Sequence, residues 1–301
     1  MRGLKWTRRT TRKIARELKG MGIPVSASTV RRLLKQMDYS LRVNVKRIES
    51  GIKNPPNRQD RNRQFLYIAQ QRERVARVGN PTVSVDSKKR EMIGQFKNHG
   101  RCWVREPIPV NDHDFLSDAV GIGLPYSLYD MERNEGTVYV GTSHDTPAFA
   151  ADAITAWWQR WGRLQYPKAT ELLILADCGG SNSCRSRVWK WQLQNQLSNR
   201  FLLPVTVCHY PPGASKWNPV EHRLLSEISK NWQGKPLNSY ATALNYIRRT
   251  ETTTGLRVHA YLVRKHYENG QRVAEKDFRS IAITKHVTLP QWNYTLTPSK
   301  M

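Results

Sequence analysis

The feature that most constrains the fold of this chain is a short apolar run that ends at an acid. Leu172–Ala176 is an unbroken apolar stretch, and Asp177 and a Cys-Gly-Gly turn follow it directly. Such a run between turn residues is typical of a strand covered on both faces in a parallel or mixed sheet. Asp177 would then lie where a buried strand opens into a loop, which is where open α/β sheets place their chemistry. Taken alone, an Asp ahead of two glycines can equally serve only to open a turn.

Two other acids occupy comparable positions. Asp86 ends residues 82–86, in which valines alternate with small polar residues as they do in a strand. Glu221 follows Asn218 and Pro219, a pair that favours the start of a helix. Asn218 and Glu221 also resemble a capping box, which would explain this acid without any chemistry. The sequence leaves both explanations of Glu221 open.

Two acids that end strands and one that opens a helix are typical of phosphodiester chemistry. Two divalent cations, about 4 Å apart, can activate the attacking oxygen and stabilise the leaving oxygen. Magnesium prefers oxygen ligands and keeps several waters, so a few carboxylates are enough to hold it. Without a metal the three carboxylates would repel one another, which argues against a purely structural role for the set.

Two rival metal sites are weaker. Asp112, His113 and Asp114 lie in an irregular stretch, but no buried strand leads to them, and Asp-rich loops usually form turns. Four residues could in principle bind zinc, although their spacing matches no common zinc motif. They are Cys178, Cys184, Cys208 and His209.

Three segments of the chain resemble a known family. They are VSVDSKKREMIGQFKN, LLILADCGGSNSCRSRVWKWQLQ and VCHYPPGASKWNPVEHRLLSEISKNWQGKPL. These segments are similar to the Rhodopirellula-type transposases of bacterial insertion sequences, which are DDE transposases with a ribonuclease H-like core. The resemblance covers nearly the whole chain and implies that Asp86, Asp177 and Glu221 form a catalytic triad. The implied cofactor is a pair of Mg²⁺ ions, for which Mn²⁺ can substitute. Relatives usually carry more sequence ahead of the region matched by residues 4–41, so we expect the chain to be shortened at its N-terminus.

Positive charge is concentrated in the first quarter of the chain. Residues 1–80 hold 21 of the 49 lysine and arginine residues but 5 of the 24 acids, in a chain of formal net charge +25. Such a block indicates a nucleic-acid-binding module rather than a uniformly solvated basic surface. No apolar stretch has the length of a membrane span, and no signal peptide is evident. We therefore expect a cytoplasmic protein with free thiols and no membrane partner. The resemblance implies that it is bacterial and nucleoid-associated.

Residues 4–48 fit a helix-turn-helix, with a glycine-rich break between two helical apolar patterns and Ser26 as the cap of the second. The second helix would present basic side chains to DNA, and a strand or wing would follow it. The alternative is an amphipathic hairpin with a solvated basic face. His209 and His222, close to the third acid, are possible accessory residues for phosphate contact or proton transfer. The predicted DNA-binding residues are Ser28, Thr29, Arg31, Arg32, Lys35, Lys46, Arg47, Lys88 and Lys216.

We predict an α/β fold with a ribonuclease H-like mixed sheet flanked by helices and preceded by an α-helical helix-turn-helix domain. Residues 92–97 are expected to pair back on the Asp86 strand, and the tryptophans of the helix after Pro147 are expected in the core. The expected function is transposition by cleavage and strand transfer at element ends, on double-stranded DNA and as a homo-oligomer. The alternatives are a metal-dependent nuclease and an inactive DNA-binding relic. The predicted domains are 1–50 (helix-turn-helix), 51–80 (basic linker helix), 81–235 (catalytic core) and 236–301 (C-terminal extension of the core).

Overall fold

The computed structural model describes residues 9–41 and 57–299. The chain divides into two compact units, Met1–Gly51 and Ile52–Met301. Lys46 and Arg47, together with the predicted strand or wing, lie outside the described residues.

The first unit contains the helices α1 (Thr11–Gly20) and α2 (Ala27–Gln36), which lie where the sequence predicts them. Ser26 caps α2, because its hydroxyl accepts a hydrogen bond of 3.1 Å from the backbone N–H of Thr29. Thr10 caps α1 in the same way. The two helices pack against each other with a glycine-containing turn between them.

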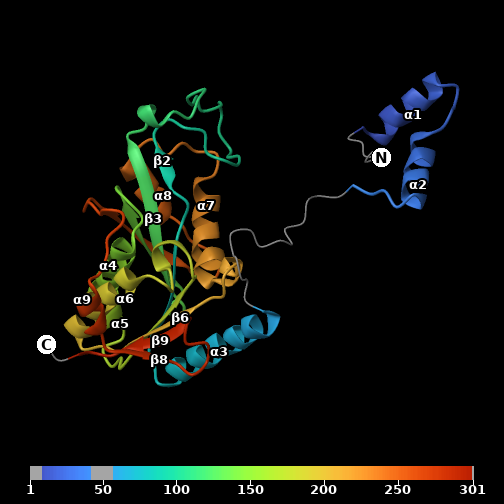
Figure 1. The fold of residues 1–301 in the computed structure, drawn as a ribbon. Helices are drawn as coiled ribbons and strands as arrows, with labels where there is room; N and C mark the ends of the chain where they lie inside the picture. The colour runs from blue at the N-terminus through green and yellow to red at the C-terminus, as the bar shows by residue number, and fades with distance from the viewer. Residues whose placement is uncertain (1–8, 42–56, 300–301) are drawn as a thin grey trace. The chain divides into compact units, whose positions relative to one another are not determined.

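The second unit is built on a mixed sheet whose strands run in the order β7-β4-β3-β1-β5-β6-β9-β8 (Figure 1). The strand β1 is antiparallel to β3 and parallel to β5, and β6 is parallel to β5. The central order β4-β3-β1-β5-β6, with the first three strands antiparallel and the last two parallel to β1, matches the predicted ribonuclease H-like core. The strands are β1 (Thr82–Ser87), β2 (Glu91–Ile93), β3 (Gly121–Asp130), β4 (Glu135–Gly141), β5 (Leu172–Ala176), β6 (Val205–His209), β7 (Arg257–Val263), β8 (Ile283–Lys285) and β9 (Asn293–Leu296).

The prediction that residues 92–97 pair back on β1 is wrong. The short strand β2 pairs instead with β3, with Glu91 opposite Gly123. Both sides of β1 are already hydrogen-bonded, one to β3 and the other to β5, so β1 has no free edge for β2.

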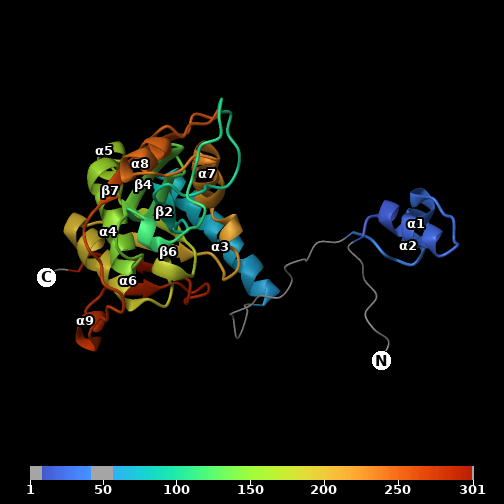
Figure 2. The same ribbon diagram turned by 90° about the horizontal axis from the view of Figure 1, so that it is seen from above.

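Helices cover both faces of the sheet (Figures 1 and 2). In β5, Leu172 and Ile174 pack into the cluster that contains α4 and α6, whereas Leu173 and Leu175 pack against α3 on the opposite face. This burial on both faces explains the unbroken apolar run. Trp157 in α4 is 2% exposed, which confirms the prediction of a core tryptophan there. Trp161, expected in the core as well, is only partly buried and packs against the same cluster. The helices of this unit are α3 (Arg58–Arg77), α4 (Pro147–Trp157), α5 (Arg163–Gln165), α6 (Arg187–Gln192), α7 (Ser226–Trp232), α8 (Tyr240–Arg248) and α9 (Glu275–Arg279).

The helix α3 is part of the packed unit and not only a connection to it. Its Ile68 and Val75 are buried against the sheet. The buried amide of Gln64 donates hydrogen bonds to the carbonyl of His209 (2.8 Å) and to Oδ1 of Asn293 (2.7 Å). These bonds tie α3 to β6 and β9.

The C-terminal residues are built into both edges of the same sheet. The strand β7 pairs in parallel with β4, while β9 pairs with β6 and then with β8. None of the helices that the structure describes is long and apolar enough to cross a membrane.

Candidate active site

Asp86 and Asp177 lie at the adjacent ends of two central strands. The parallel register of β1 and β5 pairs Val85 with Ala176, so each acid follows on its own strand at the same level. Neighbouring strands are about 4.8 Å apart, so the two carboxylates lie close together at the same end of these two strands. Asp86 is 6% exposed, and Asp177 is partly buried.

Glu221 lies in the first turns of a helix that starts at Pro219, as the sequence predicts. These turns are π-helical over Glu221–Leu225, and α7 continues the helix. Short π-helical segments inside helices are frequent at functional sites. The capping-box explanation of Glu221 does not hold, because the side chain of Asn218 bonds to β1 and not to the start of the helix.

Asn218 fastens this helix to the strand that carries Asp86. Its Nδ2 donates a hydrogen bond of 3.0 Å to the carbonyl of Val85, and its Oδ1 accepts one from the hydroxyl of Ser84. The same hydroxyl accepts a hydrogen bond of 3.0 Å from the backbone N–H of Val220. Asn218 and Ser84 are fully buried, so these bonds are shielded from water. They set the position of Glu221 relative to β1.

The three carboxylates influence one another electrostatically. Burial, together with the negative charges of Asp177 and Glu221, raises the pKa of Asp86 to about 8. Burial also raises the pKa of Asp177 to about 6, even though hydrogen bonds from Asn182 and Gly179 favour its charged form. This mutual repulsion is what the sequence predicts for a carboxylate cluster without its cation.

A fourth acid, Asp145, belongs to the same neighbourhood. Its charge contributes to the raised pKa of Asp177. Its Oδ1 is buried and has no hydrogen-bond partner among the described residues. In the sequence Asp145 comes just before the helix cap Thr146, where an acid is unremarkable, so no local signal separates it from an ordinary turn residue.

The loop after β5 holds Asp177 in place. Gly180 has a φ of 54°, a left-handed conformation that glycine adopts without strain. The loop then returns Asn182 to Asp177, with 3.5 Å between Nδ2 and Oδ1. Oδ1 of Asn182 accepts a hydrogen bond of 2.7 Å from the hydroxyl of Tyr126. Asn182 has no distinguishing signal in the sequence, because Tyr126 on β3, which fixes its orientation, is 56 positions away.

His209 does not lie where an accessory residue would have to be. It is fully buried, and burial lowers its pKa to about 4, so the ring is neutral and cannot reach a phosphate. Its Nδ1 lies 2.8 Å from the carbonyl oxygen of Asp177, and since a carbonyl only accepts, Nδ1 carries the proton. Its Nε2 lies 3.2 Å from the hydroxyl of Tyr294. The prediction of an accessory role is therefore corrected: His209 supports the backbone at the end of β5.

The remaining predicted residues of this unit gather around Glu221. Lys88, Lys216 and His222 line a hollow of about 390 Å³ with it. His222 is exposed, and its ring bonds to the carbonyl of Lys216. Lys88 pairs with Glu91. The hollow thus places two cations beside one of the three acids.

In the first unit, α2 carries the other predicted DNA contacts. The side chains of Arg31, Arg32 and Lys35 are exposed. The hydroxyls of Ser28 and Thr29 lie within hydrogen-bond distance of the Ser26 hydroxyl, so they belong to the cap of the helix.

The chemistry of the donor set fits a divalent cation. The described residues contain no group of three or more His, Cys, Asp or Glu side chains already spaced to hold a metal ion. The three acids do supply hard oxygen ligands whose repulsion a cation would relieve, and Asp145 adds an unpaired buried oxygen. The rivals fit less well. Asp112, His113 and Asp114 are exposed, and Cys208 packs beneath α3, apart from the cluster that holds Cys178 and Cys184.

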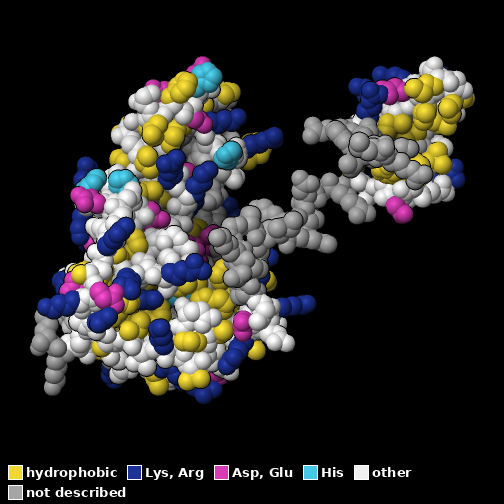
Figure 3. Space-filling view, in the orientation of Figure 1, with side chains coloured by type: hydrophobic (Ala, Val, Ile, Leu, Met, Phe, Trp, Pro, Cys, Tyr) yellow, Lys and Arg dark blue, Asp and Glu magenta, His cyan; other side chains and the backbone are white. Residues whose placement is uncertain are grey.

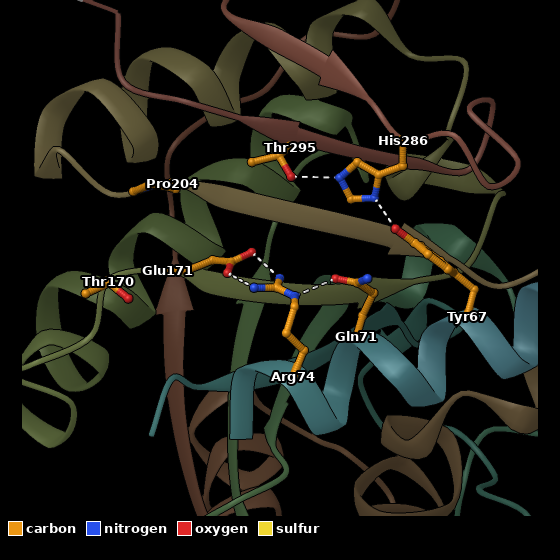
Figure 4. Close-up of a pocket in the computed structure, with 8 residues that line it drawn as sticks. All are labelled: Tyr67, Gln71, Arg74, Thr170, Glu171, Pro204, His286 and Thr295. Atoms are coloured by element: carbon orange, nitrogen blue, oxygen red, sulfur yellow. Dashed lines mark hydrogen bonds and ion pairs between the residues drawn. The ribbon is translucent and has the colours of Figure 1, made fainter. Parts of the chain in front are cut away.

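A second polar hollow lies at the opposite end of β5 (Figure 4). It has a volume of about 410 Å³, and α3 and the strands β5, β6 and β9 surround it. Arg74 of α3 binds both carboxylate oxygens of Glu171, each at 2.7 Å. His286 bridges the hydroxyls of Tyr67 and Thr295. The charged groups of this hollow are paired with each other, as expected of a contact that holds α3 on the sheet.

Lysine and arginine side chains are spread over the face of the second unit seen in Figure 3, and they are more abundant than the acidic side chains interspersed with them. This distribution matches the excess of positive charge that remains outside residues 1–80. A polyanion can therefore approach this face.

The sequence and the fold have similarities to known proteins. The model of the Rhodopirellula transposase DDE domain matches residues 1–298. No curated protein matches the sequence. Similar solved structures include the Mos1 transposase paired-end complex with left transposon end, at 14% identity and a TM-score of 0.43 over 79% of this chain and 65% of that one. They also include the mariner Mos1 paired end complex with Mg, at 12% identity and a TM-score of 0.46 over 79% and 65%. The chain thus spans about 65% of the length of those structures, and a likeness this distant carries no further weight. The family model, by contrast, covers nearly every residue, so the chain belongs to the Rhodopirellula transposase DDE domain family.

Proposed function

We propose that this protein is a DNA transposase that cleaves and joins phosphodiester bonds at the ends of an insertion sequence. The observation that carries the proposal is the meeting of Asp86, Asp177 and Glu221 at one edge of the sheet, in a chain of this family. Three repelling carboxylates are costly to the fold, and a catalytic role accounts for that cost.

Asp86, Asp177 and Glu221 would hold a pair of Mg²⁺ ions. When bound, these ions would activate the attacking oxygen and stabilise the leaving oxygen of the phosphodiester. The carboxylates must lose their protons to bind a cation, so affinity for Mg²⁺ should increase as the pH rises through about 6 and 8.

The other residues of the site would bind the DNA phosphate or orient the carboxylates. Lys88 and Lys216 are placed to attract a phosphate beside Glu221. Asn182 orients the Asp177 carboxylate, and Asn218 sets the position of Glu221. Catalysis of this kind depends on such positioning as much as on the charges themselves.

The first unit would recognise the element ends, with Arg31, Arg32 and Lys35 on the exposed side of α2. The family resemblance adds the expectation of a homo-oligomer that bridges two ends. Removal of residues 1–50 should abolish the preference for end sequences and flatten the salt dependence of DNA binding, because many phosphate contacts are lost. A truncated protein that still selected its ends would contradict the assignment of this unit.

The decisive experiment uses a duplex with the sequence of the terminal inverted repeats that this proposal expects on either side of the reading frame. The full chain is incubated with this duplex and Mg²⁺ or Mn²⁺, and a pre-cut end with a free 3′-hydroxyl is then offered with target DNA. Cleavage followed by a joined product is expected, and Asp177→Asn should abolish both. Cleavage without joining would identify a nuclease instead, and binding without cleavage would identify an inactive relic.

A further inference from the structure

A groove of about 640 Å³ lies between the first turns of α3 and the segment that leads to the Glu221 helix. Its α3 side consists of Arg58, Arg61, Asn62 and Phe65, which recur at i, i+3, i+4 and i+7 and so share one face of the helix. The opposite side is Trp217. Further along α3 the helix packs on the sheet, but these first turns project beyond it (Figure 2).

Aromatic rings line the groove. Phe65 packs against Tyr210, with ring centroids 6.0 Å apart, and meets Trp217 edge-on at 6.1 Å. Trp217 is nevertheless 58% exposed, and Nζ of Lys216 lies 5.3 Å from the centre of its ring. Phe65 and Lys216 thus contact the indole, while more than half of its surface stays exposed. Packing of the core does not account for a large aromatic ring in this position.

The groove adjoins the candidate active site along the chain. Trp217 lines the groove, while the preceding residue, Lys216, lines the hollow that contains Glu221. Asn218, the next residue, is fastened to β1 beside Asp86. The position of the indole relative to the carboxylates is therefore set by the same buried hydrogen bonds that position Glu221.

We propose that this groove binds an unpaired base of the DNA strand whose phosphate lies at the three carboxylates. The base stacks on Trp217, and Arg58 and Arg61 at the rim neutralise the neighbouring phosphates. An open aromatic ring within a cationic groove suits a ligand that is both flat and anionic, which describes a nucleotide in a single strand. The protein's net charge of +25 favours such a polyanion over a peptide. This proposal depends on the proposed function, because it assumes that a DNA strand lies at the three carboxylates.

The test compares binding of two DNA duplexes, one blunt and one with a short unpaired tail, to the full-length protein in EDTA. Loss of a single base-stacking contact in Trp217→Ala should weaken binding of the tailed duplex by about tenfold. Binding of the blunt duplex should hardly change. Trp217→Phe, which keeps a flat ring, should retain most of the preference for the tail. Trp103→Ala, at a fully exposed tryptophan of another loop, is the matched control and should leave both affinities unchanged.

A 2-aminopurine placed in the tail gives a direct readout, since stacking on the indole should quench its fluorescence in the parent but not in Trp217→Ala. Equal tail preference in the parent and Trp217→Ala, or an equal loss in Trp103→Ala, would overturn the proposal. Because the assay contains no divalent cation, it is independent of cleavage. A protein that stacks the base but never cuts DNA would contradict the proposed function alone. A protein that cuts and joins DNA but has no tail preference that depends on Trp217 would contradict only the groove.

Discussion

A partly buried carboxylate lies at each end of β5, and the pKa values of the two are shifted in opposite directions. Before the strand, Glu171 accepts two hydrogen bonds from Arg74 and another from Thr206. Burial alone would raise the pKa of Glu171, but these bonds outweigh it and lower the pKa. After the strand, Asp177 faces other carboxylates, and burial raises its pKa to about 6.

Both carboxylates are partly buried, and their partners account for the opposite directions of the two pKa shifts. A carboxylate paired with an arginine holds two elements together, here α3 and the sheet. A carboxylate that faces other carboxylates destabilises the folded protein until a cation binds. One end of the strand is therefore suited to stability and the other to chemistry, as expected at the carboxyl ends of strands in α/β sheets.

The largest expected effect is at the carboxylate cluster that follows β5. Glu221→Gln keeps the shape of the side chain but removes the charge that hard cations require. Loss of an outer-shell contact typically costs up to about 100-fold in metal affinity or activity, so loss of a ligand should lower Mg²⁺-dependent cleavage by at least that factor. The melting temperature and DNA affinity should stay at the parent values. Glu171→Gln, at the other end of β5, is the control and should cleave normally per folded molecule. Near-normal cleavage by Glu221→Gln would remove it from the triad.

The next effect concerns the attachment of the Glu221 helix. Asn218→Ala leaves the Val85 carbonyl and the Ser84 hydroxyl without their partner, so Glu221 is less well positioned. Affinity for Mg²⁺, measured by calorimetry, should fall by about 10–100-fold. Ser84→Ala removes the Ser84–Asn218 bond from the other side, together with the bond from the Val220 N–H. Because the Ser84–Asn218 bond is shared, the double variant should lose less than the sum of the two single variants. Additive losses would show that the two side chains do not act together.

At the Glu171 end of β5, Arg74→Met should lower the free energy of unfolding by about 2 kcal/mol. Breaking a buried ion pair costs more than this, but Arg74 is half-exposed and solvent screens part of the loss. Adding Glu171→Gln should recover part of the stability, because the uncompensated charge is then gone. Urea unfolding measures both variants, and cleavage per folded molecule should be unchanged. An unaltered midpoint in Arg74→Met would mean that this pair does not hold α3 in place.

The smallest effect is a change in stability with pH, which has opposite signs for carboxylates at the two ends of β5. The pKa of Asp86 is about 8 in the folded protein against an ordinary value of 3.8. The folded state therefore binds the proton more tightly than the unfolded state, and metal-free stability should fall as the pH rises from about 4 to 8. Asp86→Asn should remove this loss and raise the melting temperature at pH 8 by at least roughly 3 °C, the shift expected for each 1 kcal/mol of stability regained.

Near pH 4 the parent and Asp86→Asn should melt alike, and the exposed Asp114→Asn should show no change at either pH. Glu171→Gln should have the opposite sign at pH 8, because that carboxylate is stabilising when charged. A melting temperature of Asp86→Asn below that of the parent at pH 8 would contradict the raised pKa.

The sequence alone determined the local features of this protein. The apolar run ahead of Asp177 identified a strand buried on both faces, and Asn218-Pro219 marked the start of the Glu221 helix. The pattern around Ser26 located α2. Each of these features depends on residues within a few positions, where periodicity and capping chemistry are sufficient. The family and the three acids were identified on the same local motifs.

The tertiary structure decided which side chains share a space. It placed β2 on β3, buried His209 and brought Asp145 to Asp177. It also turned Asn218 from a candidate helix cap into a contact with Val85, 133 positions away. A buried amide bonds to whichever polar group the fold brings within 3 Å, and strand order and register determine that group. No local pattern records those pairings, which is why the carboxylates could be named from the sequence but the residues that hold them could not.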